Sequence, residues 1–252
     1  MTGVLRAERT KFFSVRSLPL LAGVAVLVST LMALLFVVSL PLTQGTSIDT
    51  LPAMQVVSAA LVGIDVAGIV VMVMGASFAG SEYSTGLAQP TFLLAPRRTA
   101  VVLAKAGVVA AVAVVLSVVT AALCTLVGQV ALLVAGRSPA PLDTELLQLA
   151  LGSALNPVFY ALIALFAALI FRSTGGGIIT ALLVLLLPAT SLLPGLGILT
   201  PLLPTSALHS LAGAADPGTT EYLAVVPAAL SLLTWLVLAG AIAVWQVRSR
   251  DV

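Results

Sequence analysis

Charge is scarce in this chain of 252 residues. Only 8% of its residues are Asp, Glu, Lys or Arg, and 5% are aromatic. Hydrophobic residues make up 60%, and the mean hydropathy is +1.21. Soluble domains contain about 25% charged and about 45–50% apolar residues. The shortage of charge therefore excludes an ordinary soluble domain and predicts an integral membrane protein.

Cysteine and histidine each occur once. Cys124 has no partner for an intramolecular disulfide, and His209 alone cannot form a multi-histidine metal cluster. The sequence also contains no GxxxxGKS/T phosphate loop, no HExxH and no GxSxG motif. We therefore predict no enzyme activity and no cofactor site. If this chain helps to do work, another chain supplies the chemistry.

Long apolar runs are what the sequence has in abundance. A bilayer core about 30 Å thick takes about 20 helical residues at 1.5 Å per residue. Six runs qualify and predict an all-α, polytopic membrane protein with a single domain of six transmembrane helices. The predicted spans are residues 18–42, 56–79, 100–126, 149–171, 175–193 and 222–247.

Cations are concentrated on one side of these spans. Because cytoplasmic loops are enriched in Lys and Arg, we predict that both termini are cytoplasmic. The pI of about 9.0 then reflects topology, and we expect no nucleic acid partner. Arg137 alone falls on the other side. The cytoplasmic cations are Arg6, Arg9, Lys11, Arg16, Arg97, Arg98, Lys105, Arg172, Arg248 and Arg250.

The N-terminal residues 1–17 mix cations with apolar side chains such as Leu5, Phe12 and Phe13. This mixture is typical of a helix that lies in the headgroup layer of membrane lipids. A frayed basic tail is the alternative. The apolar run that follows is longer than the roughly 7–15 residues of a signal-peptide core, so we interpret it as a retained span.

Residues 81–99 form a polar, basic stretch between the second and third predicted spans. Gly86 and Pro90 prevent one straight helix from continuing through it. Pro90 suits the first turn of a new helix, because its missing N–H would be unpaired there. We therefore predict a short helix over residues 90–94, across the mouth of the two spans.

Two ionisable residues fall within predicted spans. Lys105 lies about 9 Å into the third span, and its side chain can extend back to the interface or toward Glu82. Asp65 lies well inside the second span, where an unpaired carboxylate costs several kcal/mol. Asp65 is therefore expected to face the bundle interior or to be protonated. Lys105 is one candidate partner, and a contact with cargo or a proton is the alternative.

Residues 194–221 are apolar but contain four prolines. The prolines exclude a single helix, and the low polarity disfavours a solvated loop. We predict extracellular re-entrant or interfacial half-helices in this segment. His209 is then expected to be an interfacial histidine, with contact to a substrate as the alternative.

The loop between the second and third spans also carries a motif: Glu-Tyr-x-Thr-Gly, then Pro-Arg-Arg, then Ala-Lys. The chain thereby resembles the membrane subunits of type-2 ATP-binding-cassette (ABC) transporters, most closely the short six-span permeases of actinobacteria. The resemblance extends to the basic N-terminal helix and to the proline-broken segment before the last span. The residues that carry the motif are Glu82, Tyr83, Thr85, Gly86, Pro96, Arg97, Arg98, Ala104 and Lys105.

The resemblance implies that residues 81–99 hold a coupling helix that docks on a separate ABC ATPase subunit. Residues 83–94, which include Pro90 and Phe92, would then transmit ATP-driven movement to the spans. It also implies a second permease copy, identical or paralogous, and a multi-pass location in a bacterial cell membrane. An ordinary cytoplasmic loop is the alternative. The residues implied to hold the base of the coupling helix are Glu82, Arg97, Arg98 and Lys105.

The expected function is therefore the permease subunit of an ABC exporter. A secondary, proton-coupled transporter that uses Asp65 is the alternative, but it should show internal repeats, which the sequence lacks. A membrane-embedded enzyme is disfavoured, because this sequence contains no nucleophile–base pair and no metal-binding group. The apolar character of the spans favours a hydrophobic or amphipathic cargo.

Overall fold

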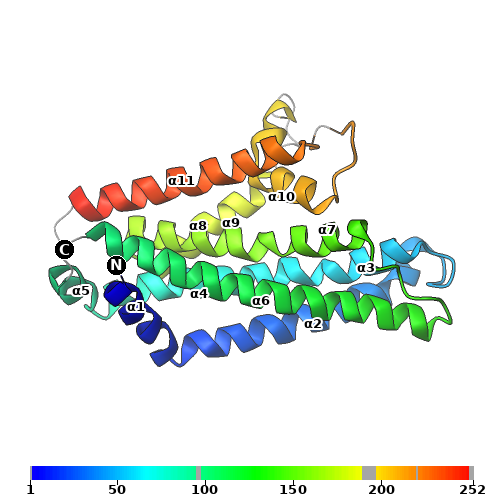
Figure 1. Cartoon of the computed structure of the whole chain (residues 1–252), viewed down its shortest axis with the longest axis horizontal. Coiled ribbons are helices and arrows are strands. Elements are labelled where there is room, and N and C mark those ends of the chain that lie inside the picture. The colour runs from blue at the N-terminus through cyan, green and yellow to red at the C-terminus, as the bar shows by residue number, and fades with distance from the viewer. Residues whose placement is uncertain (1, 95–97, 189–196, 220, 250–252) are drawn as a thin grey trace.

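The computed structural model describes residues 2–94, 98–188, 197–219 and 221–249. Over these residues the chain forms helices joined by turns and contains no β-strand, which confirms the all-α prediction. Figure 1 shows that the long helices run along the longest axis of the molecule.

Five helical stretches within the described residues are long and apolar enough to cross a membrane. They are α2 (Ser17–Gln44), α3 with α4 (Ala53–Leu61 and Gly63–Ser84), α6 (Arg98–Val134), α7 with α8 (Thr144–Ser153 and Leu155–Phe171) and α11 (Val225–Ser249). The shorter helices are α1 (Thr2–Ser14), α5 (Ala88–Leu94), α9 (Thr174–Leu186), the 3-10 helix η2 (Gly197–Leu202) and α10 (Pro204–Ala212).

The fifth predicted span, residues 175–193, is where the structure differs most from the prediction. Helix α9 has 13 residues, about 20 Å at 1.5 Å per residue, which is less than the roughly 30 Å of a bilayer core. Pro188 follows closely and cannot donate a helical hydrogen bond. Residues 189–193 lie outside the described part of the chain. Where six full-length spans were predicted, the described residues therefore contain five helical stretches of membrane length and the short α9.

Two spans that were predicted as continuous contain a break. The second bends at Val62, between α3 and α4, and the fourth bends at Ala154, between α7 and α8. The second break has a clear cause, because Pro157 lies in the first turn of α8 and removes a backbone donor there. The segment predicted to be re-entrant contains two short helices, η2, which includes Pro201, and α10, which begins at Pro204.

Helix α4 is the centre of the bundle and packs against α2, α6, α8 and α9. Two glycines allow its neighbours to come close. A Cβ added at Gly75 would lie 2.4 Å from the carbonyl oxygen of Ala161 on α8. One added at Gly80 would lie 2.3 Å from the backbone nitrogen of Thr174 on α9. Small residues at such crossings let membrane helices pack backbone to backbone.

This packing predicts that Gly75→Ala lowers the free energy of unfolding by about 1–3 kcal/mol, because the new methyl group would overlap the Ala161 carbonyl. Gly23→Ala is the matched control. Gly23 is exposed on α2, and a Cβ added there meets nothing within 4 Å. Thermal unfolding in detergent gives the comparison, and equal melting temperatures for the two variants would contradict the close α4–α8 contact.

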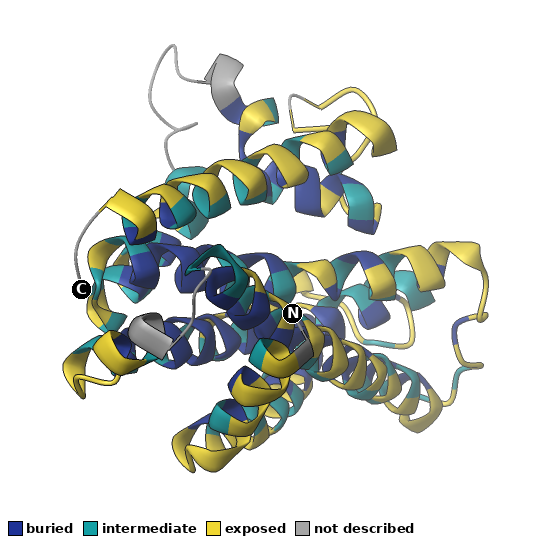
Figure 2. Cartoon of the chain, turned by 60° about the vertical axis from the view of Figure 1, so that its left-hand side comes forward, coloured by how far each residue is buried: buried dark blue, intermediate teal, exposed yellow. Residues whose placement is uncertain are grey.

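The outward faces of the long helices are apolar and uncovered. Figure 2 shows buried residues on the inner helices and exposed residues along the outer surfaces. On α2, for example, Leu20, Leu27 and Val38 have 69%, 60% and 69% of their surface exposed. Exposing continuous apolar faces of this kind is unfavourable in water but not in the hydrocarbon core of a bilayer. The long apolar helices therefore indicate a membrane-embedded protein.

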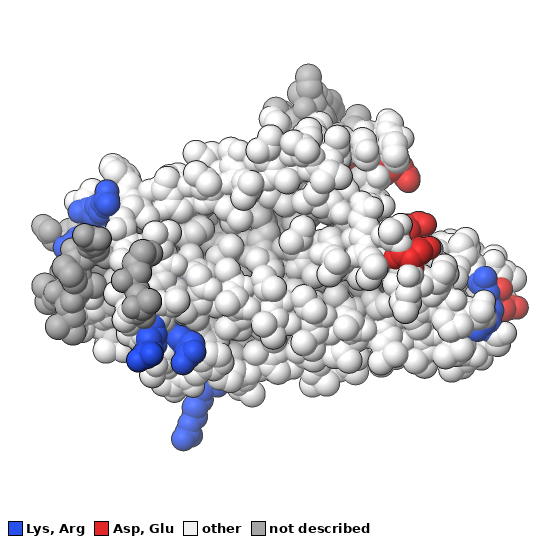
Figure 3. Space-filling model, viewed as in Figure 1, with Lys and Arg blue, Asp and Glu red and all other residues white. Residues whose placement is uncertain are grey.

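Charge divides the molecule along its long axis. Lys and Arg gather at the end that contains α1, α5 and the last turns of α11, which we call the cation-rich end (Figures 1 and 3). The acidic side chains visible in Figure 3 lie at the opposite end, near α3 and α7. Arg137, which follows α6 at this opposite end, donates a hydrogen bond to the carbonyl oxygen of Leu51.

Candidate functional site

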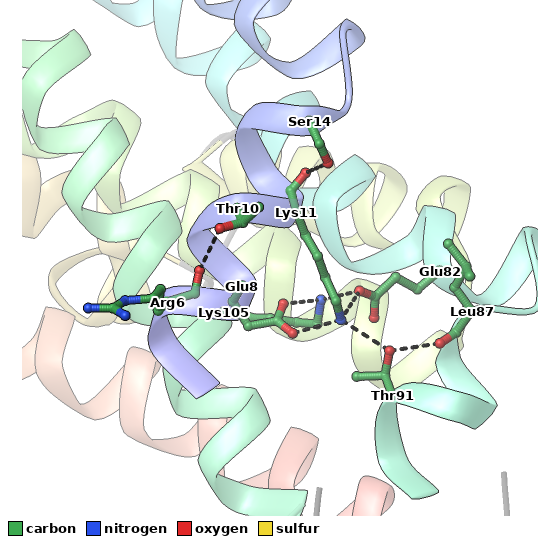
Figure 4. Close-up of polar contacts among 9 residues, drawn as sticks. All are labelled: Arg6, Glu8, Thr10, Lys11, Ser14, Glu82, Leu87, Thr91 and Lys105. Carbon is green, nitrogen blue, oxygen red and sulfur yellow. Dashed lines mark hydrogen bonds and ion pairs between the residues drawn. The ribbon is translucent and has the colours of Figure 1, made fainter. Parts of the chain in front are cut away.

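Four charged side chains meet at the cation-rich end, and we call them the ion cluster: Glu8 and Lys11 of α1, Glu82 of α4 and Lys105 of α6. Figure 4 shows them converging from three helices. The Nζ atom of Lys105 lies 2.8 Å from a carboxylate oxygen of Glu8 and 2.8 Å from one of Glu82. The Nζ atom of Lys11 lies 2.8 Å and 3.0 Å from oxygens of the same two carboxylates. Each cation therefore bridges both anions.

Helical spacing and aromatic packing bring α1 to this position. Glu8 and Lys11 are three residues apart and therefore share one face of α1. Phe12, on the next turn, packs edge-on against Phe78 of α4 with ring centroids 5.1 Å apart. The Nζ atom of Lys105 lies 4.4 Å from the Phe78 ring centroid, in a cation–π contact. The aromatic pair thus covers the ion cluster on its apolar side.

The ion cluster is buried and its formal charges cancel. Lys105 has 0% of its side chain exposed, and Glu8 has 2%. Removing such charges from water is expensive, and only good pairing makes burial tolerable. Two cations against two carboxylates supply that pairing. Because the balance involves α1, α4 and α6 together, none of the three helices can leave without exposing an unpaired charge.

Lys11 is the more accessible cation, with 37% of its side chain exposed. Burial lowers the pKa of Lys11, but its hydrogen bond with Glu8 and the charges of Glu82 and Glu8 outweigh that effect, so the pKa is raised. A raised lysine pKa means that the stabilising contribution is complete at neutral pH. It is lost only when the pH rises through the raised value.

The side chain of Thr91 ties helix α5 to the ion cluster. Lys11 donates a hydrogen bond of 3.1 Å to the hydroxyl oxygen of Thr91. The Thr91 hydroxyl in turn donates to the carbonyl oxygen of Leu87, one turn earlier, at 2.7 Å. A movement of α5 would therefore reach Lys11 directly and, through it, Glu8 and Glu82.

The structure places several of the sequence-predicted residues around this cluster. The predicted approach of Lys105 to Glu82 is present. Arg98 donates to the carbonyl oxygen of Val247 at 2.9 Å and so links the start of α6 to the end of α11. Pro96 and Arg97 lie outside the described residues. Phe92 belongs to α5, but its side chain also lies outside them.

The remaining predicted residues shape the turn between α4 and α5. Thr85 donates a side-chain hydrogen bond to the carbonyl one turn earlier, at 2.7 Å. Gly86 has a φ of +73°, a left-handed conformation that favours glycine. Pro90 lies in the first turn of α5, which begins two residues earlier than predicted. The Tyr83 ring lies 6.0 Å from the guanidinium carbon of Arg172.

Asp65 does not pair with Lys105, so that candidate pairing is wrong. Lys105 is turned toward the cation-rich end, where Glu8 and Glu82 hold it. Asp65 accepts a hydrogen bond from the side-chain amide of Asn156 on α8 and is exposed in a pocket. The two side chains thus belong to opposite ends of the bundle.

Sequence reasoning missed Glu8 as a member of the site. Its signal was present, because Glu8 is the only acid before the first span and lies one turn from Lys11. A carboxylate needs a charged partner when its side chain is buried, as that of Glu8 is. That partner, Lys105, is distant in sequence, so only the packing of α1 against α6 reveals it.

Comparison of the chain with protein-family models, curated proteins and solved structures finds no match. A proposal about function therefore rests on the sequence and on the geometry of the ion cluster. Its four members are already paired with one another, which leaves no free base or nucleophile. Within the described residues, no group of three His, Cys, Asp or Glu could hold a metal ion. Such a cluster is suited to holding helices together and to passing movement from one helix to another.

Proposed function

We propose that this chain is the membrane permease subunit of an ATP-driven exporter of the ABC type. The observation that carries the proposal is the ion cluster, which joins the short helix α5 to α1 and to two membrane-length helices. The chain itself has no phosphate-binding loop. A short helix between two spans, fixed to a buried joint, suits a subunit that receives force from a separate ATPase.

The proposed topology has six crossings, with both termini in the cytoplasm of a bacterial cell. Helix α9 begins beside the end of α4 and runs toward the opposite end of the bundle (Figure 1). Together with η2 and α10 it would complete the fifth crossing, with the short helices re-entering from outside. The gathering of Lys and Arg at the cation-rich end supports a cytoplasmic assignment for that end. Helix α1 would then lie at the inner interface.

The proposed mechanism passes movement from α5 into the bundle. Closure of the ATPase would push α5, and the Thr91–Lys11 hydrogen bond would carry the movement to the ion cluster. Because Glu82 and Lys105 belong to α4 and α6, those helices would shift together with α1. A second permease copy, identical or paralogous, would complete the translocation path along the uncovered apolar faces.

The surface of the α4–α5 turn offers a specific test. Leu87 at this turn is 57% exposed and so offers an apolar side chain that a docking partner could cover. We expect the intact chain, purified in mild detergent from its native cells, to retain an ABC ATPase subunit, and the Leu87→Asp variant to lose it. Mass spectrometry identifies the retained subunit by its GxxxxGKS/T motif.

Leu142→Asp is the matched control. Leu142 lies in the loop between α6 and α7, at the other end of the bundle, and is 79% exposed. It should retain the ATPase. Retention by both variants would reject the α4–α5 turn as the docking site. The secondary-transporter alternative predicts that no form of the chain retains an ATPase.

A further inference from the structure

A polar pocket lies at the end of the bundle opposite the ion cluster. Asp65, on its wall, is about 25 Å from Glu82 along α4 at 1.5 Å per residue. The pocket has a volume of about 360 Å³, at the lower end of the roughly 300–1,000 Å³ range of small-molecule sites. Its wall is formed by α2, α3, α4, α7, α8 and α10.

Polar side chains from five of these helices converge on the pocket. They are Gln44 of α2, Gln55 of α3, Asp65 of α4, Asn156 of α8 and His209 of α10. In the sequence these residues are scattered over more than half of the chain, and three of them stand within otherwise apolar runs. Polar groups are costly at such positions unless they have a function or a partner.

Asp65 has a neutral hydrogen-bonding partner, and His209 is the basic side chain of the pocket that interacts with its charge. The Asn156 amide donates to one carboxylate oxygen, and an amide carries no net charge. Among the described residues that line the pocket, none is Lys or Arg. A carboxylate that opens into a pocket with mainly apolar walls attracts a cation more strongly than one on a fully solvated surface.

The rest of the lining determines what kind of cation fits. Leu40, Leu149 and Leu208 give the pocket apolar walls, and the exposed imidazole of His209 adds a flat surface. A hydrated metal ion would gain nothing from these walls. An organic cation with an apolar body would bury that body against them and place its charge at Asp65.

We propose that this pocket binds small amphipathic organic cations, with Asp65 as the counter-ion and the side chains of Gln55 and Asn156 as neutral hydrogen-bonding partners. Binding requires only this chain. The further step, that the bound cation is exported cargo, rests on the proposed function. A binding assay without ATP or an ATPase subunit therefore separates the two proposals.

The fluorescent cation dimethylaminostyryl-N-methylpyridinium is a suitable probe. Its neutral analogue, which lacks the N-methyl group, differs mainly in charge. With the purified full chain in nanodiscs, fluorescence titration should give saturable binding of the cation. We expect Asp65→Asn to raise its dissociation constant by about tenfold, and to leave the weaker binding of the neutral analogue unchanged.

Two further variants keep the test decisive. Ala59→Phe fills the pocket without touching the carboxylate and should also weaken cation binding, since Ala59 lines the pocket. Asp49→Asn removes the same charge from an exposed turn at the same end and should bind as the unaltered chain does. Elution as a single peak in size-exclusion chromatography checks that each variant is folded. Equal affinity of the unaltered chain and Asp65→Asn, or no saturable binding, would overturn the proposal.

Discussion

Replacing Lys105 with Met is expected to lower the free energy of unfolding by about 3–5 kcal/mol, the usual cost of breaking a buried ion pair from one side. Lys105 is fully buried between Glu8 and Glu82. Methionine fills a similar volume but leaves two buried carboxylates with Lys11 alone. Cys124, the single cysteine, is buried and gives the readout, because a thiol-reactive dye labels it only when the chain unfolds.

Lys11→Met is the matched control for this prediction. It removes the same charge from the same ion cluster, but the Lys11 side chain is 37% exposed, and exposed ion pairs contribute only about 1 kcal/mol or less. Lys105 would still bridge the two carboxylates. The double variant Lys105→Met with Glu8→Gln should recover part of the loss, since it removes one of the uncompensated anions. Equal losses for the two single lysine variants would show that burial does not set the energetics of the ion cluster.

Much of the helical architecture could be predicted from the sequence because lipid imposes a length. The uninterrupted apolar runs predicted the ends of α2, α6 and α11 to within a few residues, except that α6 continues to Val134. Two of the failures occurred at prolines, where the missing backbone N–H outweighs hydropathy. Pro157 separates α7 from α8, and Pro188 closes α9 early, although both lie among apolar neighbours that a hydropathy window averages over.

The candidate site could be predicted only where its members are close in sequence or share a depth. Glu82 lies at the end of α4 and Lys105 near the start of α6, close to the same interface. The topology therefore predicted that their side chains could approach each other. The contact between Glu8 and Lys105 could not be predicted in this way. It depends on the docking of α1, which involves the tertiary contact between Phe12 and Phe78. Membership of His209 in the Asp65 pocket was hidden for the same reason.

Neutralising Glu8 is expected to loosen α1 without unfolding the bundle. Glu8 accepts from Lys11 with one oxygen and pairs with Lys105 through the other, so Glu8→Gln removes the direct ion pair between α1 and α6. The pair between Glu82 and Lys105 remains and keeps α4 and α6 together. A loss of about 3 kcal/mol in the docking of α1 corresponds to roughly 100-fold faster amide hydrogen exchange in this helix. Hydrogen–deuterium exchange with mass spectrometry measures it.

Arg9→Gln provides the control, because Arg9 is the next residue on α1, is exposed, and loses one charge in the same way. Its α1 should exchange as slowly as that of the unaltered chain, and α4 should stay protected in both variants. Rapid exchange confined to α1 in the Glu8 variant would show that the ion cluster is what holds this helix. If α1 stays protected, the Phe12–Phe78 contact and the remaining Lys11–Glu82 pair are sufficient to hold it, and its docking does not require the charge of Glu8. The exchange rate of α1 therefore tests whether the proposed route from α5 to the spans needs Glu8 or can pass directly from Lys11 to Glu82 on α4.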